Sequence, residues 1–211
     1  MIKTQRESNP VKKNAVTHID FHDVIECLIA AVEARDPYTS GHSSRVADIT
    51  LTLAQALGLQ GLQLEIVHMA AHLHDIGKIG VPDEVLGKEG ALTEAEWLLV
   101  KRHPRTGYDI LSRSEALSEI ADIVLHHHER WDGSGYPDGL RGEKIPLGAR
   151  IIAVADAIDA MLSPRPYRDA MTAEACARQI RENNGKQFDE KIASLALNLV
   201  LKAPPVDASE V

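Results

Sequence analysis

Hydrophobic residues recur at helical spacing along most of this 211-residue chain. Between residues 21 and 35, apolar side chains stand at positions 21, 24, 25, 28, 29 and 32, which is the pattern of a helix with one apolar face. A second helix is predicted to start at Thr39 or Ser40, either of which can cap it, and to end at Leu57 before the terminating Gly58. A third is predicted over 62–76 and stops at Gly77.

Further helical patterns follow at 82–86, 93–102, 104–113, 116–128, 147–162, 172–183 and 188–201. No alternating run of apolar and polar residues is long enough to predict a strand, and the sequence contains no internal repeat. The pattern therefore predicts an all-α fold, a compact bundle of many helices. We expect one domain over 19–202, with flexible tails at 1–18 and 203–211.

One segment, residues 129–148 (ERWDGSGYPDGLRGEKIPLG), departs from the helical pattern. It holds five of the fourteen glycines and two of the ten prolines of the chain. A loop of this length inside a compact domain is uncommon unless it has a function, and glycines allow the backbone to approach a ligand closely. Because histidines immediately precede it, we interpret the segment as a functional loop rather than a surface excursion.

Composition narrows the classes of function. The chain has 23 Lys and Arg against 31 Asp and Glu, a net charge of −8, so we expect no broad basic face for a nucleic acid polymer or an anionic membrane. No apolar run approaches the length of about 18 residues that a membrane span needs, and the polar N-terminus predicts a cytoplasmic location. Cys27 and Cys176 form no CxxC motif, which disfavours a thiolate zinc site or a disulfide scaffold.

Three consecutive histidines end the helix predicted at 116–128. His127 stands four residues after Ile123 and seven after Ile120, which places it on the apolar, inward face. His128 flanks that face, whereas His126 falls on the polar side of the helix. Helical spacing therefore favours His127 and His128 as metal ligands over His126.

The dipeptide His74–Asp75 ends the helix predicted before Gly77. A buried carboxylate is costly unless it is paired or bound to a metal ion, and an imidazole beside a carboxylate suits divalent ions. Lys78 follows Asp75 by three residues, so it either pairs with that carboxylate or meets an anionic substrate. The sequence alone leaves both roles of Lys78 open.

Three further residues are candidates of unequal weight. His42 precedes Val46 by one helical turn, so it turns inward, and Asp156 lies on the apolar face of its helix, where a carboxylate needs a partner. His103 precedes a proline that favours a helix start, which by itself is a weak indication.

A second pair of histidines, His68 and His72, has the i, i+4 spacing that can bind zinc. The glutamate of an HExxH motif is absent, and His72 lies on a different face from His74. We therefore expect His68 and His72 to be structural or surface residues.

Taken together, these segments resemble the HD-GYP family of metal-dependent phosphohydrolases. The resemblance runs from about residue 34 to residue 188 and rests on RDPYTSGHS, HLHDIGKIGVPDEVL, KRHPRTGYDIL, HHERWDGSGYPDGLRGEKIPLGARI, VADAIDAM and RPYR. His74–Asp75 corresponds to the HD pair, and residues 135–137 correspond to the GYP motif. So many pieces in one order make a chance match very improbable.

The resemblance implies an HD-domain bundle that holds a cluster of divalent metal ions, iron or manganese in the first place and nickel or zinc in the second. Lys78 would act with Asp75 in catalysis, with Asp75 bridging two metal ions. The implied metal ligands are His42, His74, Asp75, His103, His127, His128 and Asp156. The implied substrate contacts are Lys78, Gly135, Tyr136, Arg165 and Arg168.

One position departs from the family pattern. Some members carry a glutamate one helical turn before the first histidine, where it helps to hold a third metal ion, and this chain has Tyr38 there. A phenol seldom replaces a carboxylate as a ligand, so we expect two metal ions.

The implied activity is hydrolysis of cyclic di-GMP to linear pGpG or GMP, because two metal ions lower the pKa of a bridging water and clamp the phosphoryl oxygens. Two alternatives stay open at this point. The first is another cyclic dinucleotide, such as cyclic GMP-AMP, and the second is a silent module that binds nucleotide or partner proteins. For regulation, two alternatives also stay open: a stand-alone enzyme, or a partner such as a separate sensor protein or diguanylate cyclase.

Overall fold

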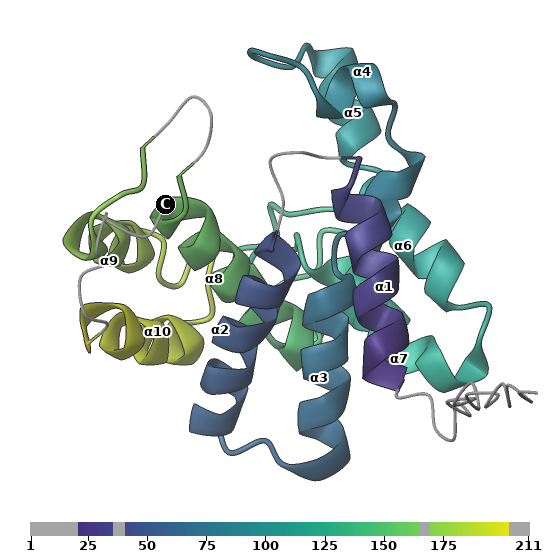
Figure 1. The fold of residues 1–211 in the computed structure, drawn as a ribbon. Helices are drawn as coiled ribbons and strands as arrows, with labels where there is room; N and C mark the ends of the chain where they lie inside the picture. Colours follow the sequence, from purple (N-terminus) through teal and green to yellow (C-terminus); the bar gives the residue numbers. More distant parts are fainter. Residues whose placement is uncertain (1–20, 36–40, 165–168, 203–211) are drawn as a thin grey trace, which may run out of the picture.

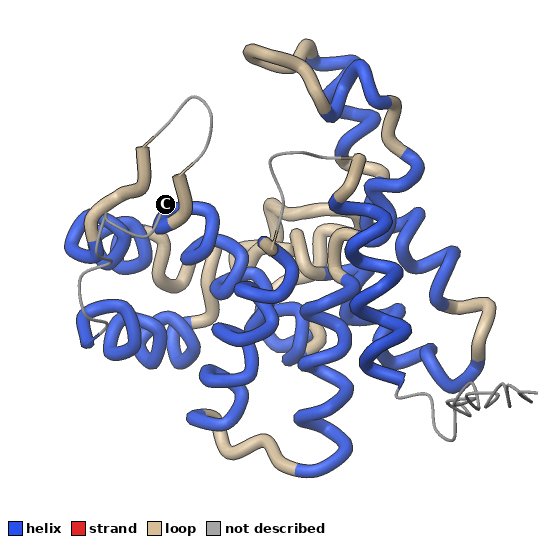
Figure 2. The backbone as a smooth tube through the Cα atoms, in the orientation of Figure 1, coloured by secondary structure: helices blue, strands red, loops and turns tan. Residues whose placement is uncertain are grey.

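The computed structural model describes residues 21–35, 41–164 and 169–202 of the chain. The regular secondary structure of these parts is helical, with no strand and one isolated bridge between Asn184 and Phe188, so the all-α prediction is confirmed for the described residues (Figure 2). The main helices are α1 (Phe21–Glu33), α2 (His42–Ala56), α3 (Gly61–Leu73), α4 (Asp83–Leu86), α5 (Glu94–Val100), α6 (His103–Leu111), α7 (Ser118–His126), α8 (Leu147–Leu162), α9 (Ala173–Glu182) and α10 (Glu190–Lys202). Short 3₁₀ turns lie at η1 (Ile76–Gly80), η2 (Glu115–Leu117) and η3 (Gly142–Lys144).

Helix α3 lies near the middle of the bundle. It packs against α2 on one side and α1 on the other, and α7 and α8 also contact it (Figure 1). Helices α4 and α5 project at one end, whereas α9 and α10 lie at the far side, next to α8 (Figure 1). Among the described helices, none combines the length and apolar character that crossing a membrane requires.

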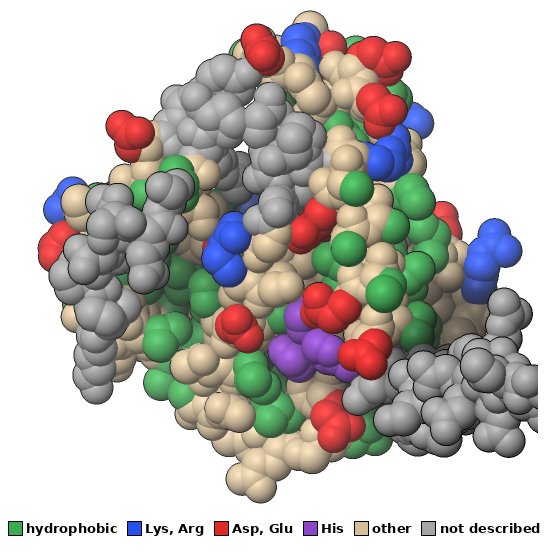
Figure 3. Space-filling view, in the orientation of Figure 1, with side chains coloured by type: hydrophobic (Ala, Val, Ile, Leu, Met, Phe, Trp, Pro, Cys, Tyr) green, Lys and Arg blue, Asp and Glu red, His purple; other side chains and the backbone are tan. Residues whose placement is uncertain are grey.

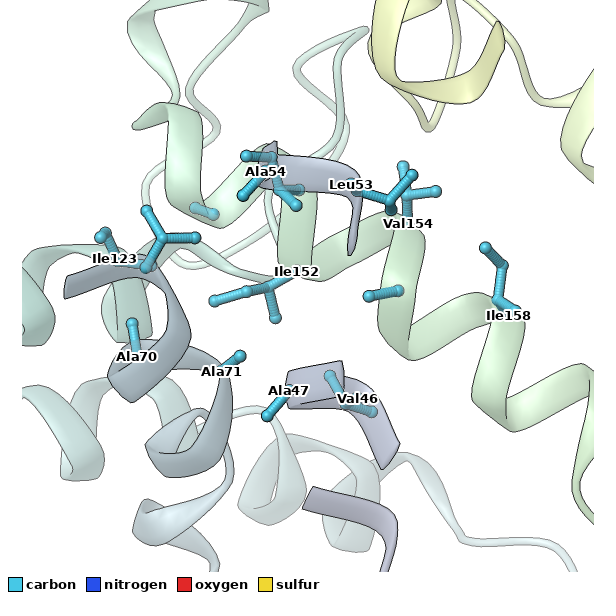
Figure 4. Packing of buried hydrophobic residues seen from close by; sticks show 14 of the residues in the cluster. Val46, Ala47, Leu53, Ala54, Ala70, Ala71, Ile123, Ile152, Val154 and Ile158 are labelled. Carbon is cyan, nitrogen blue, oxygen red and sulfur yellow. The ribbon is translucent and has the colours of Figure 1, made fainter. Parts of the chain in front are cut away.

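The core is built largely from alanine and branched aliphatic side chains. Ala47 on α2, together with Ala70 and Ala71 on α3, is completely buried and faces Ile152 of α8 (Figure 4). Small side chains at these contacts let the helix axes approach closely, because the distance between packed helices depends on the side chains between them. An alanine-rich core accounts for a chain in which only 4% of residues are aromatic.

The first helix matches its predicted position, but only part of its apolar pattern is buried. Ile25, Ile29 and Val32 pack into the core, whereas Val24 and Leu28 are 41% and 49% exposed. The apolar face of α1 is therefore wider than the surface that it buries within this chain.

The start of α2 differs from the sequence expectation. Its N-cap residue is Gly41, with φ of 69°, and not Thr39 or Ser40, which lie outside the described residues. The carboxylate of Glu33, at the end of α1, accepts hydrogen bonds from the backbone N–H groups of Gly41 (2.8 Å) and Ser43 (3.1 Å). A distant carboxylate thus satisfies donors that a local side chain was expected to satisfy. At the other end, Gly58 follows the helix with φ of 89°, as predicted.

The third helix ends three residues earlier than the pattern predicts, and η1 continues the chain. The reason lies at Gly77, where an added Cβ would overlap the carbonyl oxygen of His103 and lie 2.5 Å from the backbone nitrogen of Gly107. Gly107 in turn leaves 2.9 Å between its own would-be Cβ and Val124. Two glycines therefore let η1 lie directly on α6 and bring the residues before η1 next to His103.

Hydrogen bonds fix the position of the Gly-rich loop at 129–148 at several points. Trp131 and Asp132 donate backbone hydrogen bonds to the carbonyls of Gln187 and Lys186, at 3.1 and 2.8 Å. The backbone N–H of Asp138 donates to the buried carboxylate of Glu129 at 2.7 Å. The loop is thus held against the segment before α10, and His126 of α7 contacts it at Asp138. The predicted tails, 1–18 and 203–211, lie outside the described residues and stay predictions.

Candidate metal centre

The fold brings the predicted ligand residues together from five places in the chain. They stand at helix ends or on inward faces, where the backbone fixes their position. His42 opens α2, His74 and Asp75 follow α3, His103 opens α6, His127 and His128 follow the last residues of α7, and Asp156 lies in α8.

Asp75 lies between two groups of histidines. Its Oδ2 is 3.4 Å from His74 Nε2 and 3.8 Å from His42 Nε2, and its Oδ1 is 3.3 Å from His103 Nε2. The nitrogen and oxygen atoms of His42, His74 and Asp75 lie within 4.8 Å of one another, and so do those of His103, His127 and His128. Each carboxylate oxygen of Asp75 therefore faces a different group.

The backbone sets the orientation of three of these imidazoles. In each, Nδ1 lies within hydrogen-bond distance of the carbonyl oxygen three residues earlier. The pairs are His74 with Ala71 (2.7 Å), His103 with Val100 (2.8 Å) and His127 with Val124 (2.6 Å). Because a carbonyl only accepts, Nδ1 carries a proton in each ring. In the neutral rings of His103 and His127, Nε2 therefore keeps a lone pair that faces the centre.

A close contact between two such nitrogens shows that the centre fits a cation. His103 Nε2 and His127 Nε2 are 3.2 Å apart, and both rings are almost completely buried. Burial lowers the pKa of both imidazoles, although the charge of Asp75 opposes it, so both are neutral near pH 7. Two lone pairs that face each other at this distance repel, and a divalent metal ion between them removes the repulsion.

The charges at Asp75 are strongly coupled. Burial raises the pKa of its carboxyl, but the ammonium of Lys78, 2.7 Å from Oδ2, and the neighbouring His74 hold it well below its usual range. Burial likewise lowers the pKa of His74, yet the Asp75 carboxylate outweighs this and raises it to about 9. Of the two roles left open for Lys78, pairing with Asp75 is the one seen in this structure.

The GYP segment lies directly beside the centre. The ring of Tyr136 contacts the ring of His128, with 4.9 Å between centroids, and its backbone N–H donates to the His128 carbonyl at 3.2 Å. Burial, with the charges of Asp75 and Asp156, raises the pKa of the Tyr136 phenol above its usual value. The phenol therefore keeps its proton and can donate it to an anion. At Gly135, an added Cβ would overlap the backbone of Arg130 and lie 2.5 Å from Glu129 Cα, so glycine here has a packing reason.

A comparison with known families now decides the assignment. The family model described as HD domain matches residues 26–192. The chain belongs to the HD-domain family. Its HD pair is His74–Asp75, and the GYP motif at 135–137 places it in the HD-GYP group.

Two curated relatives cover most of this HD domain. The cyclic di-GMP phosphodiesterase response regulator RpfG of Xanthomonas campestris is 48% identical over 177 residues, which are 83% of this chain and 47% of that protein. The 3′3′-cGAMP-specific phosphodiesterase 2 of Vibrio cholerae is 39% identical over 177 residues, 83% of this chain and 34% of its own length. The chain thus spans less than half the length of these relatives.

The fold is also similar to that of solved structures. Bd1817, an HDG"Y"P protein from Bdellovibrio bacteriovorus, matches with a TM-score of 0.62 and 23% sequence identity. The match covers 77% of this chain and 52% of that one. At this identity the likeness concerns the fold, and it agrees with the all-helical HD-domain architecture.

One residue of this HD domain was missed by the sequence reasoning. Asp159, which is 4% exposed, accepts a hydrogen bond from His42 Nδ1 at 2.7 Å, and Arg45 Nε donates to it at 2.6 Å. It therefore fixes the His42 ring so that Nε2 points at Asp156, 3.4 Å away. The i, i+3 spacing of Asp156 and Asp159 on one helix face was the available signal.

We expect Asp159→Ala to weaken divalent metal binding by about 10- to 100-fold, because His42 loses the acceptor that orients its ring. Asp159→Asn keeps an oxygen acceptor and should recover most of the affinity. Ser163→Ala is a matched control, since Ser163 Oγ donates to the same carboxylate at 3.0 Å but does not contact His42. Competition against a metal-binding dye measures the affinity, and wild-type binding by Asp159→Ala would contradict the assigned role.

His126 lies on the polar side of α7, beside Asp122 and outside the two ligand groups, as helical spacing indicates, but this side is buried. It is 7% exposed rather than solvent-facing, with Nδ1 near the Asp122 carbonyl (2.8 Å) and Nε2 near Asp138 Oδ2 (3.1 Å). The loop at 129–148 folds back over this face of α7 and covers it. His126 thus connects the helix with the loop, outside the two ligand groups.

Three residues named from the sequence, Tyr38, Arg165 and Arg168, lie outside the described residues. Their predicted roles stay predictions.

Proposed function

We propose that this HD-GYP domain hydrolyses a phosphodiester bond of a cyclic dinucleotide, with cyclic di-GMP as the favoured substrate and pGpG or GMP as the product. The observation that carries the proposal is the position of Asp75, whose two oxygens each face a separate histidine group. Identity of 48% to a cyclic di-GMP phosphodiesterase over 83% of this chain supports the substrate class.

Seven side chains would hold the metal ions in this proposal: His42, His74, Asp75, His103, His127, His128 and Asp156. Divalent ions there would supply positive charge for the phosphate and lower the pKa of the attacking water. Asp75 would contribute one oxygen to each histidine group and so bridge the two. Iron or manganese is our first expectation, because the resemblance to the HD-GYP family implies these ions, and the mixed set of imidazoles and carboxylates also accommodates nickel or zinc.

Two residues at the mouth of the centre would act on the substrate. Lys78, partly exposed and paired with Asp75, carries a positive charge that can turn to a phosphate oxygen once the carboxylate is engaged elsewhere. Tyr136 keeps its phenolic proton and can donate it to phosphate, or its ring can stack on a base. We propose Arg165 and Arg168 as further phosphate contacts, because a guanidinium binds phosphate through two parallel hydrogen bonds.

The substrate is tested by measuring turnover of cyclic di-GMP and cyclic GMP-AMP side by side on one metal-loaded sample. We expect faster hydrolysis of cyclic di-GMP. Preference for cyclic GMP-AMP would instead align this domain with its 39%-identical cGAMP-specific relative. Hydrolysis of neither, in a sample with full metal content, would favour the silent nucleotide-binding module and contradict the proposal.

We expect two metal ions in this centre, because Tyr38 stands where some family members have a glutamate. Elemental analysis of a Mn²⁺-loaded sample, with the chain concentration measured independently, counts the ions. Tyr38→Glu is the informative variant, since a carboxylate at this position is expected to add a third Mn²⁺. The count is repeated on His68→Ala, because His68 and His72 form a separate histidine pair outside this centre. Three Mn²⁺ that persist in His68→Ala would refute the prediction.

A further inference from the structure

A second histidine group lies on the outer face of the bundle, away from the centre around Asp75. It consists of His22 and Glu26 on α1 and of His68 and His72 on α3. Each pair has i, i+4 spacing, so each presents two side chains on one face of its helix, and α1 packs directly against α3. Figure 3 shows histidine side chains gathered on this face with acidic side chains around them.

We propose that His22, Glu26, His68 and His72 form a second binding site, for a divalent transition metal ion such as Zn²⁺. Ligand atoms of the three histidines lie within 4.8 Å of one another. Glu26 Oε1 is 3.2 Å from His72 Nδ1 and 3.9 Å from His22 Nε2. Three imidazoles and one carboxylate are a donor set that suits tetrahedral Zn²⁺.

The distances between the ligand atoms require only small movements of exposed side chains to match those of a zinc site. With bonds of about 2.0–2.1 Å, the ligand atoms of a tetrahedral zinc site are about 3.3 Å apart. His72 and Glu26 already have that separation. His22 and Glu26 have side chains that are 47% and 40% exposed, so they can move closer without disturbing the core.

His72 supplies the observation that points to a ligand rather than to a chance cluster. Its side chain is 5% exposed, and its Nδ1 is buried without a hydrogen-bond partner among the described residues. The nearby Glu26 oxygen lies at hydrogen-bond distance but in a direction unsuitable for one. A buried polar atom without a partner is costly, and a metal ion between His72 and Glu26 would satisfy both.

The two centres are separate. His72 and His74 stand two residues apart at the end of α3, and side chains with that spacing on a helix point to nearly opposite sides. His72 Nδ1 faces Glu26 of α1, whereas His74 Nε2 faces Asp75. No residue belongs to both groups.

A metal ion here would fasten α1 to α3, and α1 reaches the catalytic side of the molecule. Glu33, at the last turn of α1, accepts hydrogen bonds from the backbone N–H groups of Gly41 and Ser43, which flank His42. The site would therefore stabilise the position of the helix that orients a ligand of the Asp75 centre.

The test uses Zn²⁺ itself. The full chain, freed of metal, is dialysed against buffered Zn²⁺, and the bound zinc is counted in the wild type, His68→Ala and His22→Ala. We expect each variant to bind one zinc ion fewer than the wild type. We also expect zinc to raise the melting temperature of each variant by less than it raises that of the wild type. Asp23→Asn is the control, because Asp23 is an exposed acid beside His22 on α1 and should not change the count.

The same samples, loaded with Mn²⁺, are assayed for cyclic di-GMP hydrolysis, which separates this proposal from the proposed function. We expect activity within about twofold of the wild type in both variants, since neither residue lies in the Asp75 centre. Equal zinc counts in the wild type and both variants would overturn the second site. The side chain of His22 is largely exposed, so His22→Ala is expected to fold normally. It therefore still tests the second site if His68→Ala does not fold.

Discussion

Replacing Asp75 with asparagine is expected to lower hydrolysis of cyclic di-GMP by about 1,000-fold or more, a loss of several kcal/mol of transition-state stabilisation. Asparagine is nearly the same size, but it is neutral and offers one oxygen where Asp75 offers two. It therefore cannot face both histidine groups with an anionic oxygen, and Lys78 loses the carboxylate that lies 2.7 Å away. Rates at saturating Mn²⁺ and the bound metal per chain are the two measurements.

Asp109→Asn is the matched control for Asp75→Asn. Asp109 is an exposed aspartate on α6, so the same change of charge there should leave the rate and the metal content unaltered. A variant Asp75→Asn that binds metal normally and retains a tenth of the wild-type rate would show that Asp75 does not bridge the two groups.

Gly77→Ala is expected to have the largest effect on stability. The new methyl group would overlap the His103 carbonyl and crowd the backbone of Gly107, so η1 has to move away from α6. Overpacking against backbone atoms costs about 3 kcal/mol, which lowers the melting temperature of a chain of this size by roughly 6–12 °C. The same movement separates Asp75 from His103, so metal affinity and activity should fall together.

Gly80→Ala, in the same 3₁₀ turn, is the comparison for Gly77→Ala. Its Cβ would lie 3.1 Å from the side-chain methyl of Thr106, which can rotate, so we expect a much smaller change in melting temperature. Thermal unfolding followed by circular dichroism measures both variants. Equal melting temperatures for Gly77→Ala and the wild type would contradict the close approach of η1 to α6.

Much of the fold follows from local pattern. Helix α8 spans the predicted range 147–162, and α2 ends before Gly58 as predicted. In both places the residues of the segment itself determine where the helix lies. The failures occur where a distant segment intervenes. The start of α2 is capped by Glu33 from another helix, and the early end of α3 reflects the contact of Gly77 with His103.

The ligand residues of the candidate site also divide into those that a local pattern indicated and those that only the packing of distant segments brings in. Inward helical positions indicated His42, His127 and Asp156, whereas His103 had only a neighbouring proline and entered through the family resemblance. No pattern in one segment could show that His103 Nε2 meets His127 Nε2, since the two residues are brought together by packing of α6 on α7. The burial of His126 was not predicted for a related reason, because the loop that covers it carries no helical period.

The most direct test of the central claim is to remove and restore metal on one sample. The chain is purified without oxygen, its metal content is measured, and cyclic di-GMP hydrolysis is followed before chelation, after chelation and after addition of Fe²⁺ or Mn²⁺. We predict that activity disappears with the metal and returns with it, in proportion to the bound ions. Hydrolysis that continues unchanged in the metal-free protein would contradict the account.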